Sequence, residues 1–265
     1  MGLHYDIIAL DVDGTLLTDD HKLTQGTCEA IREAARRGAE IVLCTGRGPG
    51  GAIPVLEEIG LAGTIITHNG GATVETAKRK VIHQYTLREE QLQVFVDYCR
   101  RHELHFDIST AFEVLVERLT PEIEEIYGQF HIRPTLRQPG AALPGEPVKM
   151  TVSGPKDMID EVERDWNGWN HELQWIRSGE YFIDVQHRYA TKGRALEQLA
   201  RIRGVDRRRI MAIGNYYNDI GMLEMAGLGV AVANAPEAVK SSADVVTSSN
   251  AEEGVMRALL EYAWD

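Results

Sequence analysis

The stretch YDIIALDVDGTLL, residues 5–17, decides the fold of this chain. Residues 5–10 are a short, nearly unbroken apolar run rich in isoleucine, which predicts a strand buried on both faces. Two carboxylates, Asp11 and Asp13, follow this run at once, and Gly14 then allows the chain to turn. The predicted strand therefore leads directly from the protein interior into a charged loop.

The segments that follow alternate between helical and buried-strand patterns. A helical pattern that begins at Thr24 and stops at Gly38 precedes a second apolar strand over residues 40–44. A glycine-rich turn, a helix that ends at Gly60 and a third strand over residues 64–67 come next. This β-α-β-α-β order is typical of a parallel sheet covered by helices, so we expect an α/β fold with a doubly wound, Rossmann-like core.

A change of pattern after residue 82 predicts an inserted domain. Residues 83–186 combine helices with half-buried strands, as in an α+β domain. The expected helices are 88–103, 121–130 and 155–167, and the expected strands are 113–116, 148–153, 174–176 and 181–185. We therefore expect a core of residues 1–82 and 187–265, interrupted by an α+β cap of residues 83–186.

The charge of the chain disfavours nucleic acid as a partner. Its 265 residues are 43% apolar, which is enough to fill a real core. Lys and Arg number 28 against 40 for Asp and Glu, and the formal net charge is −12. Such a surface repels a phosphate backbone instead of neutralising it, so we expect no binding of nucleic acid.

The cysteines and the N-terminal segment predict a cytoplasmic protein. Cys28, Cys44 and Cys99 form no CxxC pair, so neither a disulfide framework nor a zinc site is expected. The N-terminal segment meets acidic residues within a few positions and lacks the long apolar region of a signal peptide. No apolar run approaches the roughly 20 residues that span a bilayer. We expect no membrane association, and the sequence leaves the oligomeric state open.

Polar residues gather at the predicted carboxyl ends of the core strands, where open parallel sheets bind their ligands. Asp11 and Asp13 follow the first strand, Thr45-Gly46-Arg47 follows the second, and a run with Asn215 and Asp219 follows a later strand over residues 210–214. Clustered carboxylates repel each other at neutral pH unless a cation lies among them, and hard oxygen ligands favour Mg²⁺. The sequence therefore predicts a magnesium site.

The DVDGT loop, residues 11–15, has the properties of a phosphate-binding loop. In an extended segment, residues two apart point the same way, so Asp11 and Asp13 can face one substrate. Gly14 permits a sharp turn that brings backbone N–H groups near an anion, and the hydroxyl of Thr15 can brace the loop. The alternative is a solvated turn after a strand, which a lone DxDG does not exclude.

The ordered motifs of the chain resemble those of the haloacid dehalogenase superfamily, in its Cof-type branch with an inserted C2 cap. The resemblance covers essentially the whole length, and it is carried by LDVDGTLL at 10–17, VLCTGR at 42–47, THNGG at 67–71, TKGRAL at 191–196 and IGNYYNDIGML at 213–223. It implies a Mg²⁺-dependent phosphatase of small phosphorylated metabolites, such as sugar phosphates, nucleotides or cofactor phosphates.

The resemblance implies a role for each of four residues. Asp11 is the expected nucleophile, which forms an aspartyl-phosphate that water then hydrolyses. Asp13 is expected to protonate the leaving oxygen and later to deprotonate that water. Thr45 is expected to bind a phosphoryl oxygen, and Lys192 to neutralise charge on the transferring group. Taken alone, Thr45 could be a helix N-cap and Lys192 a solvated charge.

Four further residues are expected near the substrate. Gly46 and Arg47 end the second motif, Asn69 lies in the third, and Asn218 lies in the last. Arg47 could equally be an exposed structural arginine, and Asn69 with the following glycine could form only a turn.

The last motif departs from the family pattern at one position. The family usually reads GDxxND, whereas this chain has Asn215 where the first acid is expected. By the resemblance, Mg²⁺ is held by the carboxylate of Asp11, the backbone carbonyl of Asp13 and the last motif, through Asn215 and Asp219. An amide oxygen brings no negative charge, so we expect weaker binding of Mg²⁺ than in relatives with an acid there.

Three alternative interpretations stay open. The run GRGPGG at 46–51 matches GxGxxG, but an acid does not end the next strand, which argues against a dinucleotide site. A phosphomutase could use the same core and cap. A binding or regulatory homologue with weak or absent catalysis is the third alternative, because of Asn215.

Overall fold

The computed structural model describes residues 4–129 and 132–264. The chain divides into two compact units, one of Met1–His83 with Thr191–Asp265 and one of Gln84–Ala190. Each unit is built on a sheet of its own, so the described residues form an α/β protein with a second, inserted sheet.

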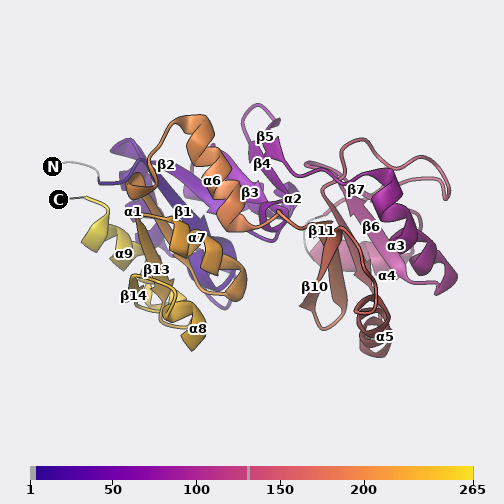
Figure 1. Ribbon diagram of the computed structural model, residues 1–265. Coiled ribbons are helices and arrows are strands. Elements are labelled where there is room, and N and C mark those ends of the chain that lie inside the picture. The colour runs from indigo at the N-terminus through magenta and orange to yellow at the C-terminus, as the bar shows by residue number, and fades with distance from the viewer. Residues whose placement is uncertain (1–3, 130–131, 265) are drawn as a thin grey trace. The chain divides into compact units, whose positions relative to one another are not determined.

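The first unit contains an eight-stranded mixed sheet, in the order β14-β13-β12-β1-β2-β3-β4-β5 (Figure 1). Its strands are β1 (Ile7–Asp11), β2 (Glu40–Cys44), β3 (Thr64–Thr67), β4 (Ala72–Glu75), β5 (Lys80–Gln84), β12 (Ile210–Gly214), β13 (Leu228–Val232) and β14 (Val245–Thr247). Neighbours from β14 to β3 pair in parallel. The predicted fold class is therefore confirmed.

One edge of this sheet differs from the all-parallel arrangement that the sequence predicted. Strand β4 pairs with β3 antiparallel. The chain reverses between them through the tight turn His68–Gly70, in which Asn69 and Gly70 have φ of 53° and 99°. So short a connection can join only antiparallel strands, because a parallel crossover needs a dozen residues or more. The sheet is mixed for that reason.

Local sequence signals explain where the core helices begin and end. The hydroxyls of Thr24 and Thr191 accept hydrogen bonds from backbone N–H groups three residues ahead, at the starts of α1 and α6. Helices α2 and α6 stop at Gly60 and Gly204, which take the left-handed conformation. The helices of this unit are α1 (Gln25–Arg36), α2 (Pro49–Ile59), α6 (Lys192–Arg203), α7 (Ile220–Met225), α8 (Glu237–Lys240) and α9 (Gly254–Tyr262).

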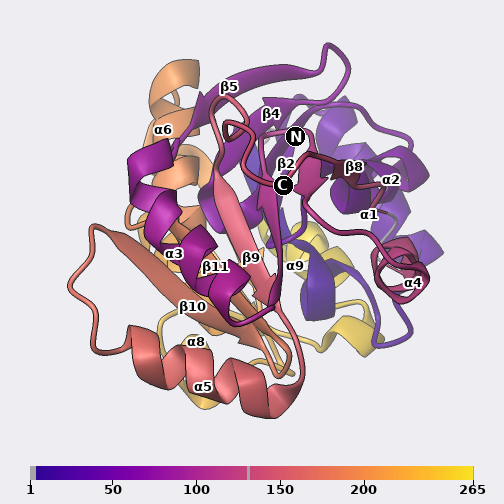
Figure 2. The ribbon, with the colours of Figure 1, turned by 90° about the vertical axis from the view of Figure 1, so that its right-hand side faces the viewer.

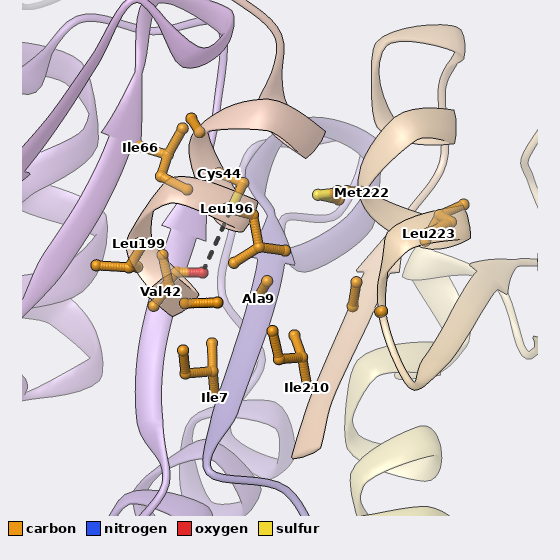
Figure 3. Packing of buried hydrophobic residues seen from close by; sticks show 14 of the residues in the cluster. Ile7, Ala9, Val42, Cys44, Ile66, Leu196, Leu199, Ile210, Met222 and Leu223 are labelled. Carbon is orange, nitrogen blue, oxygen red and sulfur yellow. Dashed lines mark hydrogen bonds between the residues drawn. The ribbon is translucent and has the colours of Figure 1, made fainter. Parts of the chain in front are cut away.

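A buried apolar cluster joins α6 and α7 to one face of the core sheet (Figure 3). Ile7 and Ala9 of β1 belong to this cluster, and so do Leu196 of α6 and Met222 of α7. Side chains alternate between the two faces of a strand, so Ile8, which is also fully buried, points to the other face. Strand β1 is covered on both sides, which explains its unbroken apolar run.

The second unit contains a six-stranded sheet, in the order β10-β11-β9-β6-β7-β8. Its elements are α3 (Glu89–Arg101), β6 (His105–Ser109), β7 (Val114–Val116), α4 (Pro121–Gln129), β8 (Thr135–Leu136), β9 (Lys149–Ser153), α5 (Lys156–Trp166), β10 (Leu173–Gly179) and β11 (Phe182–His187). The predicted cap helices and strands are confirmed to within a few residues, except that residue 130 lies outside the described residues. Strands β6 and β8 were not predicted.

The two faces of the cap sheet differ in polarity. Helices α3 and α5 lie on one face of this sheet (Figure 2). Phe95 and Trp166 pack edge to face there, at a centroid distance of 4.8 Å. The opposite face carries Asp107, Thr151 and Asp184, which stand beside one another on three adjacent strands. Apolar and polar positions alternate along β6, β9 and β11, as expected for strands that are covered by helices on one face.

In the part of the chain that the structure describes, no helix is long and apolar enough to cross a membrane. Cys28, Cys44 and Cys99 are all free thiols and all buried. The thiol of Cys44 lies 3.9 Å from the carbonyl oxygen of Val42 within the core cluster (Figure 3).

Candidate active site

The loop Val12–Leu16 carries the chain away from the end of β1. Asp11 is the last residue of the strand, and it is buried. Gly14 has φ of 74°, and a side chain added there would collide with the amide of Asn215. Glycine is favoured because other residues are strained at this φ, and a larger residue would also displace the side chain of Asn215. The close contact also brings the loops after β1 and β12 together.

Lys192 joins two carboxylates at the carboxyl end of the core sheet. Its Nζ atom donates to Oδ1 of Asp11 at 2.7 Å and to Oδ1 of Asp219 at 2.6 Å. The Lys192 side chain is 1% exposed and that of Asp219 is fully buried. Lys192 is the first residue of α6 and Asp219 lies in the turn after β12, so three elements that are distant in sequence meet here. Charge-assisted bonds of this length are strong in a dry interior.

The second oxygen of Asp219 fixes the loop that follows β12. Its Oδ2 atom accepts hydrogen bonds from the backbone N–H groups of Asn215 and Tyr216, each at 2.9 Å. Both carboxylate oxygens of Asp219 therefore have protein partners, one from Lys192 and one from this loop. Asp219 orients the loop and Lys192 together.

Burial and neighbouring charges set the protonation of this cluster. Burial is the main cause that raises the pKa of Asp11 to about 7, and Asp219 adds to it, while Lys192 and Thr15 act in the opposite direction. Burial disfavours the charge on Lys192, but Asp11 and Asp219 outweigh it and raise the pKa of its ammonium group. When Asp11 is ionised, the two carboxylates around Lys192 leave the cluster one positive charge short of neutrality, which favours an added cation.

Asp13 lies on the same loop but pairs with a different cation. Nε and Nη2 of Arg47 donate to its two carboxylate oxygens at 2.9 and 2.5 Å, and Nη1 of Arg47 donates to the Gly51 carbonyl oxygen. The backbone N–H of Arg47 donates to Oγ1 of Thr45 at 3.1 Å, and Thr45 is buried. Thr45, Arg47 and Asp13 thus form a connected series beside the Asp11 cluster.

The other residues expected near the substrate also form a group. The side-chain amide of Asn218 donates to Oδ1 of Asn69 at 2.9 Å. A Cβ atom at Gly46 would lie 3.1 Å from that same oxygen, so Gly46 borders Asn69 directly. The structure therefore brings the second, third and last motifs together through Gly46, Asn69 and Asn218.

The oxygen atoms around Thr15 fit a hard cation. Oγ1 of Thr15 lies 2.8 Å from Oδ2 of Asp11 and 3.2 Å from Oδ1 of Asn215. One hydroxyl hydrogen can satisfy only one of these acceptors at a time, whereas a cation can be shared by both. Among the residues that the structure describes, no three Asp, Glu, His or Cys side chains gather to form a metal site. A metal here would need the amide of Asn215 or main-chain carbonyl oxygens in addition to carboxylates.

Two asparagines that the sequence analysis did not single out hold the Asp11–Thr15 loop. The amide of Asn234 donates to the carbonyl oxygen of Gly14 at 2.8 Å, and its Oδ1 accepts from the backbone N–H of Asn250 at 3.0 Å. The amide of Asn250 donates to the carbonyl oxygen of Leu17 at 3.0 Å. Asn234 follows strand β13 at the same edge of the sheet, and this position was the signal that could have identified it.

Comparison with known proteins gives one consistent result over the full chain. The sequence model of a family described as haloacid dehalogenase-like hydrolase matches residues 8–259. The chain is 32% identical to YxeH of Bacillus subtilis, over 97% of this chain and 98% of that protein. It is 28% identical to the 5-amino-6-(5-phospho-D-ribitylamino)uracil phosphatase YcsE of Bacillus subtilis, over 97% and 95% of the two chains. The crystal structure of TM0651 from Thermotoga maritima superposes with a TM-score of 0.88 at 22% identity, over 98% of each chain.

Proposed function

The chain belongs to the haloacid dehalogenase-like hydrolases and is a phosphatase of that family, and from this premise we propose that it hydrolyses small phosphorylated metabolites through an aspartyl-phosphate on Asp11. The observation that carries the proposal is the buried contact of Lys192 with both Asp11 and Asp219. This contact fixes a nucleophile beside a permanent positive charge, which is the arrangement that phosphoryl transfer requires.

In the first half of the proposed reaction, Asp11 attacks the phosphorus atom. A carboxylate oxygen of Asp11 forms a bond to phosphorus while the bond from phosphorus to the leaving oxygen breaks. The leaving oxygen takes a proton from the carboxyl of Asp13. Lys192 and the hydroxyl of Thr45 stabilise the charge on the transferring oxygens.

In the second half, water attacks the phosphorus atom of the aspartyl-phosphate. The water gives its proton to Asp13, the bond from phosphorus to Asp11 breaks, and inorganic phosphate leaves with Asp11 restored. Arg47 donates a hydrogen bond to each carboxylate oxygen of Asp13, and Asp13 can take part in these steps only if one of these two bonds breaks. A bound phosphate offers Arg47 another anionic partner, so we expect substrate binding to release Asp13.

The family implies a metal cofactor, and we propose that it is Mg²⁺. Asp11, Asn215 and the backbone carbonyl of Asp13 would hold it, with Asp219 placing the Asn215 loop. A bound divalent cation neutralises negative charge on the phosphoryl group. This set includes one carboxylate and two neutral oxygens, so weak binding is expected.

The substrate is proposed to be a small molecule. YcsE suggests one candidate by its name, 5-amino-6-(5-phospho-D-ribitylamino)uracil, and sugar phosphates, nucleotides and cofactor phosphates are the others. The net charge of −12 continues to argue against nucleic acid. Three free, buried thiols are consistent with a cytoplasmic location.

The test is phosphate release from a panel of these esters and p-nitrophenyl phosphate, with Mg²⁺ and with EDTA. We expect turnover that requires both Mg²⁺ and Asp11, so that an Asp11→Asn variant is inactive. Isomerisation of a substrate without phosphate release would indicate a phosphomutase instead. Binding of an ester without turnover, by folded protein at high Mg²⁺, would support a regulatory homologue that Asn215 has inactivated.

A further inference from the structure

Two exposed aromatic residues lie in the turn after β12 that also carries Asp219. Tyr216 and Tyr217 are 55% and 54% exposed, and they follow Asn215 directly after the end of β12. Large apolar rings contribute most to stability when they are buried, and these two contribute little in that way. Because the two residues are exposed, their rings are available for contact with another molecule.

The backbone beneath these rings is tied to the reaction centre. The N–H of Tyr216 donates to Oδ2 of Asp219, and the N–H of Asp219 donates to the carbonyl oxygen of Tyr216 at 2.9 Å. The other oxygen of Asp219 binds Lys192, which contacts the proposed nucleophile. The two rings are therefore carried on a turn whose position is fixed by the same carboxylate that orients Lys192.

The rings also hold each other in a defined arrangement. Their centroids are 5.0 Å apart and their planes are inclined at 78°, so one ring meets the other edge to face. This contact occupies one face of one ring and one edge of the other, and more than half of each residue is exposed, 55% and 54%. Free ring faces are suited to stacking with a flat, conjugated group.

We propose that Tyr216 and Tyr217 select substrates whose leaving group carries a planar conjugated ring, such as a nucleobase or a related heterocycle. The inference rests on the proposed phosphatase function and adds the class of leaving group. The phosphoryl group binds at Asp11 and Lys192, and the ring stacks on an exposed tyrosine. Stacking of a base on an aromatic side chain typically contributes about tenfold or more to affinity.

The experiment compares substrates that differ only by a ring. Flavin mononucleotide is compared with ribitol 5-phosphate, and uridine 5′-monophosphate with ribose 5-phosphate. We expect kcat/KM to be about tenfold or more higher for the ring-bearing member of at least one pair. In a Tyr216→Leu/Tyr217→Leu variant this ratio should fall by about tenfold, whereas Tyr216→Phe/Tyr217→Phe should retain it. Leu260→Ala is the control, because Leu260 is also 55% exposed and lies on α9 of the same unit, outside the loops of the proposed site.

A binding measurement separates this inference from the proposed function. In the Asp11→Asn background, flavin mononucleotide should lose fluorescence on binding through stacking, and the double leucine variant should abolish this loss. Release of phosphate from ribose 5-phosphate tests the phosphatase by itself. The inference is overturned if the double leucine variant leaves both ratios unchanged, or if ring-free substrates are preferred in both pairs. Thermal melting of each variant checks folding, and the two single leucine variants replace the double variant if it unfolds.

Discussion

Two clusters in this molecule each combine two buried carboxylates with one lysine. One lies at the carboxyl end of the core sheet, and the other lies on a face of the cap sheet. In the core, Lys192 bonds to Asp11 and Asp219 at 2.7 and 2.6 Å. In the cap, Lys149 lies 3.3 Å from Asp184, and Asp107 stands on the far side of Thr151 in the strand register. Burial is the main cause of a raised pKa at both Asp11 and Asp107, to about 7 and about 6.

The partners of these carboxylates explain why only one cluster is suited to catalysis. In the cap, Asp107 accepts from Tyr127 at 3.0 Å and from Ser109 at 3.2 Å, and Asp184 accepts from Thr151 at 2.9 Å. Strands β6 and β9 and helix α4 supply these hydroxyls, which lie on regular elements of the cap. In the core, Asp11 ends strand β1, Asp219 lies in the turn after β12, and both share Lys192 at the start of α6, next to the loops at the carboxyl end of the sheet. That arrangement leaves the core cluster able to accept a phosphoryl group and a cation.

Removal of the lysine should distinguish the two clusters most strongly. Lys192→Met leaves Asp11 and Asp219 buried together without a counter-charge, which typically costs about 3 to 5 kcal/mol of unfolding free energy. Lys149→Met should cost about 1 to 2 kcal/mol, because hydroxyl donors remain around the cap carboxylates. Denaturant unfolding of both variants measures the difference.

The same pair of variants should differ in activity. Lys192→Met should reduce kcat by about a thousandfold or more, because the charge beside the nucleophile is lost. Equal losses of stability in the two variants would contradict the comparison. An active Lys192→Met enzyme would contradict the role proposed for this lysine.

The pH dependence of stability should reveal the cost of the buried carboxyl in the cap. The folded pKa of Asp107 is raised above its ordinary value, so the folded state holds this proton more tightly and stability falls as pH rises from about 4 to about 6. Tyr127, Ser109 and Lys149 offset part of this cost, and the charge of Asp184 adds to it. Asp107→Asn removes the ionisation, so its stability relative to the parent should increase across this pH range.

The expected gain above pH 6 is at most about 3 kcal/mol, from a shift of about two units. Thermal melting of the parent and the Asp107→Asn variant between pH 4 and pH 8 measures it. A difference in melting temperature that stays constant over this range would show that Asp107 is not a buried acid with a raised pKa.

The sequence predicted the core better than the edges of the sheets. Strands buried on both faces, such as β1, appear as continuous apolar runs and were recognised. Strand β6, His105–Ser109, alternates polar and apolar residues over only five positions directly after a helix, and it was missed. Strands β8 and β14 have two and three residues, too few to form a recognisable pattern. Short strands form because neighbouring strands hold them, which a local pattern does not record.

The candidate site was recognised as far as its residues occur in motifs. Asp11, Asp13 and Lys192 belong to motifs, and the structure shows where each one lies. The place of Asn234 after β13 indicates the edge of the sheet where it lies, but its hydrogen bond to Gly14 joins positions 220 residues apart, and no local pattern identifies that partner. The ion pair of Arg47 with Asp13 also could not be predicted, because it depends on the conformations of two loops.

Replacement of Asn215 by the acid that the family usually has there should increase the difference in cation binding between the core cluster and the cap cluster. Asn215→Asp places a third carboxylate beside Asp11 and Asp219, so the metal-free variant should be less stable than the parent. The added charge should lower the Mg²⁺ concentration for half-maximal activity by about tenfold. The rise in melting temperature on addition of Mg²⁺ provides a readout that is independent of activity, and it should be larger in the variant. An unchanged response to Mg²⁺ would show that Asn215 is not a ligand.

The smallest expected effect concerns the asparagine that holds the Asp11–Thr15 loop. Asn234→Asp keeps an acceptor for the N–H of Asn250 but replaces the donor to the Gly14 carbonyl oxygen with a second acceptor. The loop should then shift by a fraction of an ångström, and kcat should fall by about tenfold with little change in KM. The loss of one hydrogen bond should reduce stability by only about 1 kcal/mol.

Asn234→Ala is the control, because it removes both hydrogen bonds without placing two acceptors together. If Asn234 positions the loop, Asn234→Asp should lower kcat at least as much as Asn234→Ala, since repulsion moves the loop further than a missing contact does. If Asn234 contributes only to stability, both variants should melt earlier while kcat, measured well below the melting temperature, stays at the parent value. Steady-state kinetics and thermal melting of the same preparations separate the two cases.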